Sequence, residues 1–499
     1  MNRPETVSNQ RFSSRWALLL SVLGIAVGTG NIWRFPRIAA ANGSDVGAGG
    51  FLIAWVVFLL AWSIPLIIAE YALGQTGRMG TIGSFARLTR GRFAWMGAFV
   101  GFVATAIMFY YSVVTGWCVY FTLATVGRPL PASPDEAVAI WDGFQRSGLP
   151  LAFHALALLF GALACWQGVR SIERANKILV PALFAIVAIA ALRALTLPGA
   201  GAGIAYLFRV DWTTLGDPDV WLQALTQNAW DTGAGWGLIL TYAAYMRREH
   251  GVVRNAVLTG VGNNTVSLVA ATMIFGFVFA VLGQRMETVE ILEVMRNSGP
   301  ASTGLTFIWM PQLFAAMPFG RPLAVLFFVA LSFAALSSLI SMIELATRNL
   351  VDLGVERHRA VALVAVGGFV LGLPSAINLR FFANQDNVWG VALLVSGAFV
   401  ALGVVIHGAR RLRGEVTTGD DWPLPAGWES VMRVLIPLEA LVLVVWWLSF
   451  AFGGAWYDPL AEYSIMTIGL QWGIVLAAFL ALNGWLARRT GAENRRSGG

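Results

Sequence analysis

The chain has 499 residues, of which 57% are hydrophobic and 12% are charged, and its formal net charge is +7 at pH 7. Soluble globular domains carry about 25% charged residues, so this composition excludes a soluble protein and indicates one that crosses a membrane many times. The positive charges are spread along the chain, which argues against a basic patch for nucleic acid.

Apolar runs long enough to span a bilayer, roughly 20 residues each, recur about twelve times. We predict spans at 16–41, 50–74, 94–125, 150–168, 175–196, 221–246, 254–283, 322–348, 358–374, 387–408, 431–452 and 463–487. They leave no room for a separate soluble domain, so we predict an all-α membrane protein of about twelve transmembrane helices.

Basic residues mark one side of this arrangement, because they precede the first span and follow each even-numbered span. The opposite loops carry acids such as Asp135 and Glu287. Short basic loops face the cytoplasm, so both tails, 1–15 and 488–499, are predicted to be cytoplasmic. Cys118 and Cys165 fall inside predicted spans, which argues against an exterior disulfide.

The first span contains residues that an ordinary membrane helix avoids: Gly28, Gly30, Asn31 and Pro36. We predict that the helix unwinds at 28–31 and then restarts. Free backbone groups are tolerated in a bilayer only where they line a polar cavity. Open carbonyls suit a cation there, and the N-terminus of the restarted helix suits an anionic group.

A glycine-rich face packed against a neighbouring helix is the alternative for this span. It would explain Gly24 and Gly28. It would not explain Asn31 and Arg34 within the same span.

The next two spans carry polar groups of undecided role. Glu70, near the end of the second span, is either a snorkelling cap or a buried partner. Tyr110 and Tyr111 lie in the middle of the third span, where each phenol needs a hydrogen-bond partner, and one of them could face the broken stretch.

The sixth span repeats the peculiarity of the first, with Asp231 followed by Gly233, Gly235 and Gly237. Glycine-interrupted helices in corresponding positions of two halves point to a transporter site between inverted repeats. We therefore predict two inverted five-helix repeats over 16–408, with helices 1 and 6 broken, plus two peripheral spans over 431–487.

The seventh and eighth spans add oxygen-bearing side chains, among them Asn263, Ser267, Ser337 and Ser338. The hydroxyls could face a hard cation. Each could equally bond to a carbonyl of its own helix. The loop at 284–321 is long enough to be a lid.

Taken in order, these motifs resemble the neurotransmitter:sodium symporter family, and the chain is similar to the bacterial leucine transporter over residues 9–410. The resemblance is carried by Gly24 to Pro36, Asn42-Gly43, Glu70, Tyr110-Tyr111, Asn176-Lys177 with Pro181, Thr241 to Tyr245, and Ala334 to Ser338. It implies a sodium-coupled symporter that imports an amino acid or a closely related small amine by alternating access in a bacterial inner membrane. No set of nucleophile, base and orienting residue, no metal-ligand cluster and no nucleotide-binding loop stands out in the sequence, so we expect neither an enzyme nor an organic cofactor.

The resemblance implies one or two sodium ions and a substrate pocket. The first sodium would be held by Ala26, Asn31, Asp231 and Asn263. The second would be held by Gly24, Val27, Ala334, Ser337 and Ser338. The substrate would contact Gly28, Thr29, Gly30, Ile107, Tyr111, Trp230, Gly233, Trp236, Ser338 and Met342. Family members that carry monoamines have an aspartate at position 28, so the glycine in this chain indicates an amino acid.

Two gates follow from the same resemblance. Arg34 would close the outer side with Asp386 or Asn387, beside Gln227. Tyr245 and Asp352 would belong to the inner latch. The family's Arg and Trp in the N-terminal tail are Asn9 and Phe12 in this chain, and Arg11 is the candidate replacement for the Arg.

Asp231 stands where the family usually has Ser or Thr. It could supply the negative charge that chloride gives other members, and a unit charge at ~4 Å is worth about 4 kcal/mol at an effective dielectric near 20. It could instead replace the carboxylate of a substrate that is an amine, or bind a proton. Trp55 and Ser267 occupy two positions at which members carry anion-site residues. We expect transport without chloride.

A transporter-like sensor or channel without concentrative flux is the alternative function. The expected partners are a small-molecule substrate and membrane lipid, without nucleic acid.

Overall fold

The computed structural model describes residues 11–296, 304–416, 421–452 and 456–491, and every regular element in these ranges is helical. This confirms the predicted all-α fold. Asn9 and most of the two terminal tails lie outside the described residues.

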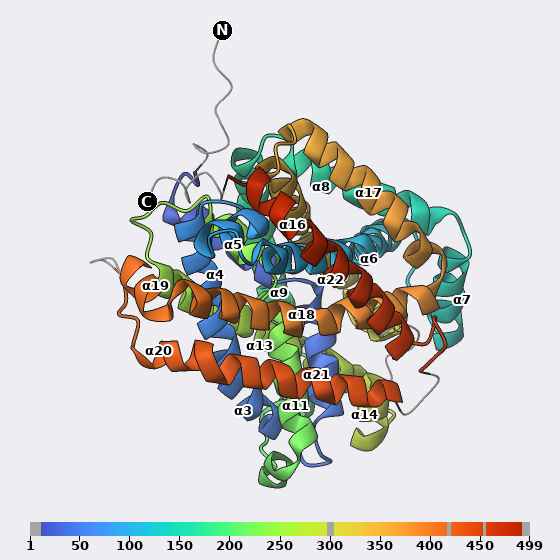
Figure 1. Cartoon of the computed structure of the whole chain (residues 1–499). Helices are drawn as coiled ribbons and strands as arrows, with labels where there is room; N and C mark the ends of the chain where they lie inside the picture. Colours follow the sequence, from blue (N-terminus) through green and yellow to red (C-terminus); the bar gives the residue numbers. More distant parts are fainter. Residues whose placement is uncertain (1–10, 297–303, 417–420, 453–455, 492–499) are drawn as a thin grey trace.

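The helices follow one another from the blue end of the chain to the red end in Figure 1. In the first half they are α1 (Arg15–Ala26), η2 (Gly30–Arg34), α2 (Phe35–Ala41), α3 (Gly49–Phe58), η3 (Leu59–Ser63), α4 (Ile64–Gly77), α5 (Thr81–Leu88), α6 (Ala94–Gly127), α7 (Pro134–Gln145), α8 (Leu149–Cys165), α9 (Val169–Leu195) and α10 (Ala200–Phe208). In the second half they are η4 (Trp212–Gly216), α11 (Pro218–Asp231), α12 (Leu238–Ala243), α13 (Val252–Leu282), α14 (Thr288–Arg296), η6 (Leu305–Trp309), α15 (Met310–Ala315), α16 (Gly320–Asp352), α17 (Arg357–Ile377), α18 (Leu379–His407), α19 (Ala409–Val416), α20 (Gly427–Ser430), η7 (Val431–Leu435), α21 (Ile436–Phe452) and α22 (Ile465–Arg489).

Among the described residues, nine helices are long and apolar enough to cross a membrane, or eleven if each of two bent helix pairs is one span. The pair α11 and α12, which covers the sixth predicted span, is not among these eleven. The total of twelve spans and the inverted repeats therefore stay predictions.

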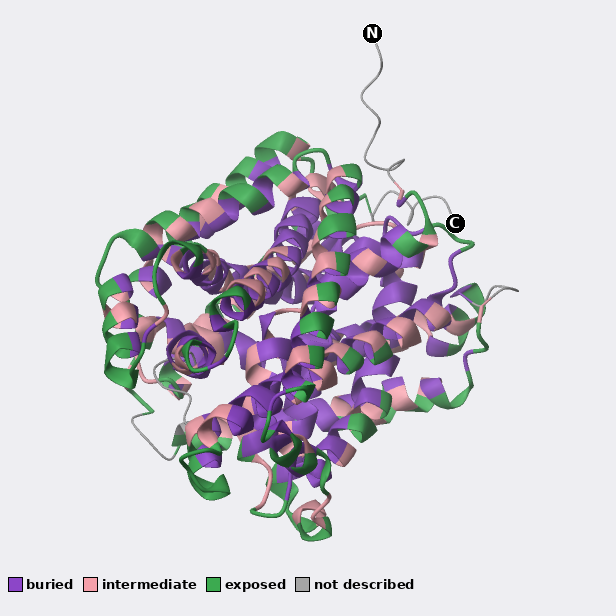
Figure 2. Ribbon diagram, turned by 180° about the vertical axis from the view of Figure 1, so that it is seen from behind, coloured by how far each residue is buried: buried purple, intermediate pink, exposed green. Residues whose placement is uncertain are grey.

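Burial separates a central group of helices from a peripheral one. The most apolar stretch of α6 is 78% buried and that of α16 is 72% buried, whereas that of α22 is 11% buried. Figure 2 shows the buried residues gathered in the middle of the bundle and the exposed ones along its outer helices. The elements that meet at the centre thus include the long helices of the third and eighth spans.

The first span is broken, although one position earlier than the sequence suggested. α1 ends at Ala26, Val27 has φ −81° and ψ 89°, and Gly30 already begins the π-helix η2. The two parts of the span meet at 52°. The Asn31 side chain accepts a hydrogen bond from Gly28 N at 2.8 Å. This side-chain cap lets the helix resume before Asn31, so our expectation of unwinding through 31 was wrong.

The break in the sixth span lies between α11 and α12, where Gly233, Gly235 and Gly237 all have positive φ. Backbone of that kind favours glycine because other residues are strained there. Glu70 satisfies the exposed amides: its carboxylate accepts from Gly235 N at 2.7 Å, Gly237 N at 3.1 Å and Leu240 N at 2.9 Å. Glu70 is fully buried, so it is a buried partner and not a snorkelling cap.

Replacing Glu70 with glutamine should destabilise the fold. The glutamine side chain would point an amide N–H donor at backbone N–H groups, which are donors too. Losing the charge-assisted hydrogen bonds should lower the free energy of unfolding by about 3 kcal/mol. We expect a clearly lower midpoint of thermal unfolding in detergent. Glu249→Gln is the matched control, because the Glu249 side chain is 70% exposed. Equal midpoints for the two variants would contradict this role of Glu70.

The predicted lid loop contains α14, η6 and α15 in its described part, while 297–303 lie outside the described residues. Arg296 Nε donates to Ala40 O at 3.0 Å, and the Phe307 ring lies 5.9 Å from that of Trp33. The loop therefore packs on the restarted half of the first span. Its movement as a lid stays a prediction.

Candidate functional site

A cavity of about 400 Å³ lies where the two breaks meet α6, α16 and α18. All predicted substrate-binding residues line it, namely Gly28, Thr29, Gly30, Ile107, Tyr111, Trp230, Gly233, Trp236, Ser338 and Met342. Residues from separate spans are thus brought to one place, which no single stretch of sequence could show.

One end of the cavity is polar because the restarted first span points its backbone amides there. Thr29 N lies 3.4 Å and Thr29 Oγ1 3.3 Å from the Tyr111 hydroxyl. A Cβ added to Gly28 would lie 3.1 Å from Ser338 Oγ and 3.2 Å from Tyr111 Oη. Tyr111, and not Tyr110, is therefore the phenol that faces the break, and position 28 has little room for a side chain.

The residues of the predicted first sodium site form a buried cluster of oxygens. Asn31 Nδ2 donates to Asn263 Oδ1 at 2.8 Å and to Ser267 Oγ at 2.7 Å. The same end of the Asn263 amide lies 3.0 Å from Ala26 O and 3.1 Å from Asp231 O. Two carbonyl oxygens come this close to one side-chain amide when its nitrogen donates to both of them. They also come together when a cation binds between them.

The residues of the predicted second sodium site also lie together, between α1 and α16. Ser338 Oγ lies 3.4 Å from Gly24 O and 3.3 Å from Ile25 O, and Ser337 Oγ donates to Ala334 O at 3.0 Å. One serine therefore bonds across to the first span, and the other bonds to its own helix. Val27, the remaining predicted ligand, lies in the break itself.

Asp231 lies at the edge of the first oxygen cluster and lines the cavity. Its Oδ2 accepts from Gln227 Nε2 at 3.2 Å and from Ser267 Oγ at 3.4 Å. Two neutral donors thus converge on this carboxylate. Gln227, which the family resemblance placed beside Arg34, lines the same cavity as that arginine and bonds to Asp231.

The outer gate residues line the cavity without forming the expected ion pair. The Arg34 guanidinium lies 4.3 Å from the centroid of the Trp230 ring. Within the described residues no ion pair of 4.0 Å or less joins it to Asp386. Asp386 and Asn387 both line the cavity together with Arg34, so a gate formed by these residues stays a prediction.

The outer part of the cavity includes residues that were not predicted from the sequence. Arg37, Trp447, Glu462 and Tyr463 all line it. Three of these come from α21 and the segment after it, a region for which the sequence offered only two apolar runs. The one available signal in the sequence was Arg37, a charged residue within a predicted membrane span, where charged residues usually have a functional role.

Charged residues of α16 bond to several neighbouring segments around the predicted inner latch. Asp352 pairs with Arg348 at 3.0 Å and accepts from Gly80 N at 2.5 Å. Tyr245 donates its hydroxyl to Glu344 at 2.6 Å, and Arg357 pairs with Glu344 at 2.5 Å.

Tyr245 and Asp352 were predicted at this inner latch, but the partners of both were not. The i, i+4 spacing of Arg348 and Asp352 was a usable signal. Phe12 packs on Tyr242 with 5.8 Å between ring centroids, so the tail contributes an aromatic contact in this region.

Comparison with known proteins decides the family. The family model described as "Sodium:neurotransmitter symporter family" matches residues 9–137 and 138–490. The chain belongs to this family of sodium-coupled transporters. It is therefore a transporter and not an enzyme, as the sequence predicted.

Relatives come from distant organisms. An uncharacterized sodium-dependent transporter of Methanocaldococcus jannaschii is 28% identical, over 88% of this chain and 90% of the relative. The human sodium- and chloride-dependent taurine transporter is also 28% identical, over 95% of this chain and 83% of the relative. The crystal structure of MhsT in complex with L-phenylalanine matches with a TM-score of 0.75 and 27% identity, over 88% of this chain and 99% of MhsT. This symporter thus shares the fold of a solved amino-acid complex.

Proposed function

We propose that this symporter imports an amino acid with an apolar side chain, driven by one or two sodium ions and without chloride. The observation that carries the proposal is the buried group of oxygens beside the substrate cavity, where Ala26 O and Asp231 O lie 3.0 Å and 3.1 Å from the side-chain amide of Asn263. A hard monovalent cation prefers such neutral oxygen ligands.

Sodium fits both oxygen clusters by their chemistry. In the described residues no group of three or more His, Cys, Asp or Glu gathers to hold a metal ion, whereas carbonyl, amide and hydroxyl oxygens do gather. Ser338 connects the second cluster to the cavity, because it lies near Gly24 O and also lines the substrate site. An ion there would fix the first span against α16 and so complete the substrate pocket.

An amino-acid carboxylate fits the polar end of the cavity. The amides of Thr29 and Gly30 begin the restarted helix, whose N-terminus favours an anion, and Tyr111 adds a hydroxyl donor. The remaining wall includes Ile107, Trp236 and other apolar side chains. A large apolar side chain therefore suits this wall, in keeping with the phenylalanine bound by the related MhsT.

Chloride independence is supported by the surroundings of Asp231. Gln227 and Ser267 point donors at its carboxylate, as they would at a bound halide. A fixed carboxylate beside the first oxygen cluster would stabilise a bound sodium ion by its negative charge, as chloride does in other members, at every step of the transport cycle.

An amine that lacks a carboxylate is the second candidate substrate, because Asp231 lines the cavity and could pair with an ammonium group. Gly28 favours the amino acid, since the polar end of the cavity then keeps its donors for a substrate anion.

The direction of transport follows from the proposed orientation. The basic end of the bundle would face the cytoplasm of a bacterium, with both tails on that side of the inner membrane. The cavity would then face outward, because Arg34 and Asp386, two described residues that form no ion pair with each other, line it.

Thermal unfolding in detergent tests the binding claim. A panel of amino acids and amines is added with sodium and with potassium in its place. A ligand at 100 times its dissociation constant stabilises the folded state by about 2.7 kcal/mol. We expect an apolar amino acid to raise the unfolding midpoint only with sodium. Stabilisation by amines alone, or equal effects in potassium, would contradict the proposal.

A further inference from the structure

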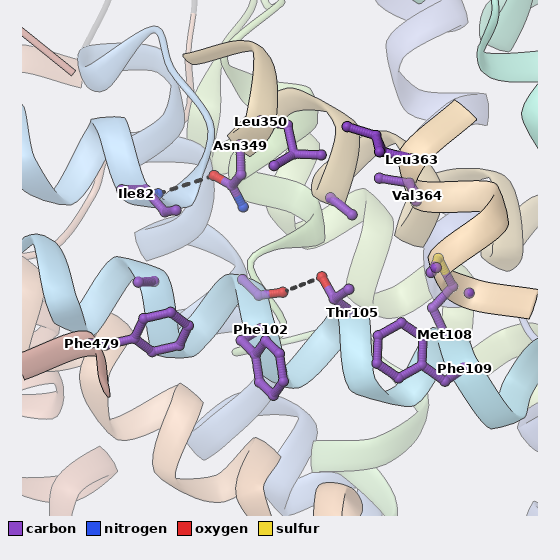
Figure 3. Close-up of a pocket in the computed structure, with 15 residues that line it drawn as sticks. Ile82, Phe102, Thr105, Met108, Phe109, Asn349, Leu350, Leu363, Val364 and Phe479 are labelled. Atoms are coloured by element: carbon purple, nitrogen blue, oxygen red, sulfur yellow. Dashed lines mark hydrogen bonds between the residues drawn. The ribbon is translucent and has the colours of Figure 1, made fainter. Parts of the chain in front are cut away.

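A second cavity, of about 260 Å³, lies away from the transport site, between α6, α16 and α17 (Figure 3). We call it the α6–α17 crevice. Phe102 and Met108 of α6, Leu350 of α16, Val364 of α17 and Phe479 of α22 line it. Leu363 also lines it and is 59% exposed, so the crevice reaches the outer surface of the bundle.

The polar side chains of the crevice are already engaged within the protein. Thr105 Oγ1, one of the two, donates to Gly101 O at 2.7 Å. The other, Asn349, accepts from Ile82 N at 3.2 Å (Figure 3). It also donates to Thr81 Oγ1 at 3.0 Å. An apolar cavity of roughly 150 Å³ already stays dry and takes up benzene, so this larger crevice suits hydrocarbon.

The surface around the crevice faces lipid. On α17, Val366 is 63% and Val370 53% exposed, and on α22, Leu482 is 45% exposed. Exposed apolar side chains on membrane-spanning helices contact acyl chains. Leu363 and Gly368 lie about 9 Å and about 17 Å along α17 from its first residue, at ~1.5 Å per residue. That depth corresponds to one leaflet of a hydrocarbon core about 30 Å thick.

The rim of the crevice at the basic end of the bundle carries exposed cations. Arg359 lies one turn of α17 before Leu363, and Arg488 and Arg489 end α22 about 14 Å beyond Phe479 at ~1.5 Å per residue. The acid nearest to Arg359 in sequence, Glu356, uses its carboxylate to cap the first turn of α17. Exposed arginines beside a membrane surface attract anionic lipid headgroups.

We propose that the α6–α17 crevice binds one acyl chain of an anionic phospholipid from the surrounding bilayer, with the headgroup at the arginines of the rim. The chain would pack against Ile82 and Leu350, on either side of the hydrogen bonds through which Asn349 holds α5 to α16. The lipid would thereby brace the region of the predicted inner latch, where Asp352 also holds Gly80. This site is independent of the proposed sodium and substrate sites.

Gly367 gives a direct test, because it lines the crevice and a Cβ added there would meet nothing within 4 Å. Gly367→Phe fills the crevice, and Val366→Phe adds the same ring one residue away on the exposed face. Phenylalanine suits a helix better than glycine does and about as well as valine does. Gly367→Leu is a smaller filling variant for use if the phenylalanine prevents folding.

The full-length protein in detergent is titrated with dioleoyl phosphatidylglycerol and dioleoyl phosphatidylcholine, and bound lipid is counted by native mass spectrometry. We expect the wild type and Val366→Phe to bind one phosphatidylglycerol about tenfold more tightly than Gly367→Phe. Phosphatidylcholine should bind more weakly, and Arg488→Gln with Arg489→Gln should remove that difference.

Equal affinity in Gly367→Phe and Val366→Phe would overturn the crevice as the site. Equal affinity for the two lipids would overturn the role of the headgroup. Neither result would affect sodium-dependent binding of the substrate, so failure of the lipid site is distinguishable from failure of the proposed function.

Discussion

Gly28→Asp is expected to abolish amino-acid binding. The new side chain would start 3.1 Å from Ser338 Oγ and 3.2 Å from Tyr111 Oη, in the space proposed for the substrate carboxylate. Two like charges at ~4 Å repel by about 4 kcal/mol at an effective dielectric near 20. That energy corresponds to a loss of affinity of roughly 1,000-fold.

Gly28→Asn separates charge from size in this experiment, because asparagine has nearly the same shape without the charge. Binding of radiolabelled amino acid in sodium is the measurement. We expect the asparagine variant to lose affinity through crowding and the aspartate variant to lose much more. Equal losses would show that position 28 does not face a substrate anion.

Asp231→Ser should convert a chloride-independent transporter into a chloride-dependent one. The serine leaves Gln227 Nε2 and Ser267 Oγ without the carboxylate that accepts from them. A bound chloride can restore the missing charge, which is worth about 4 kcal/mol at ~4 Å. We expect uptake to fall about 100-fold or more in gluconate and to recover in chloride.

Asp386→Asn is the matched control, because Asp386 also lines the cavity while the two donors point to Asp231. This control should show no response to chloride. A wild type that itself requires chloride, with Asp231→Ser unchanged in that respect, would contradict the charge-replacement role. Loss of uptake in Asp231→Ser with and without chloride would favour a role in holding an amine.

The sequence could predict that two helices are broken, because glycine, asparagine and proline each destabilise a continuous helix within the membrane. It could not locate the first break to the residue. The position of that break depends on the Asn31 side chain, which caps Gly28 N and so shortens the unwound segment.

The role of Glu70 was undecided for a related reason. Its partners, Gly235, Gly237 and Leu240, lie more than 160 residues away in the chain. Only packing of the second span against the sixth brings them together. Glu344 also bonds to residues outside α16, because Tyr245 lies 99 residues before it and Arg357 begins α17.

The family resemblance predicted the candidate site residues better than composition or periodicity could. All predicted pocket residues line one cavity, yet Arg37, Glu462 and Tyr463 at its outer end were missed. The resemblance was drawn over the first ten spans, so it offered no position for residues that follow α21.

Uptake into proteoliposomes tests the central claim most directly. The protein is reconstituted, an apolar amino acid is supplied outside, and its internal concentration is followed with and without an inward sodium gradient. We predict accumulation above the outside concentration with the gradient, in chloride or gluconate alike, and its loss when an ionophore collapses the gradient. Accumulation that persists without the gradient, or equilibration without accumulation when the gradient is present, would contradict a sodium-coupled symporter.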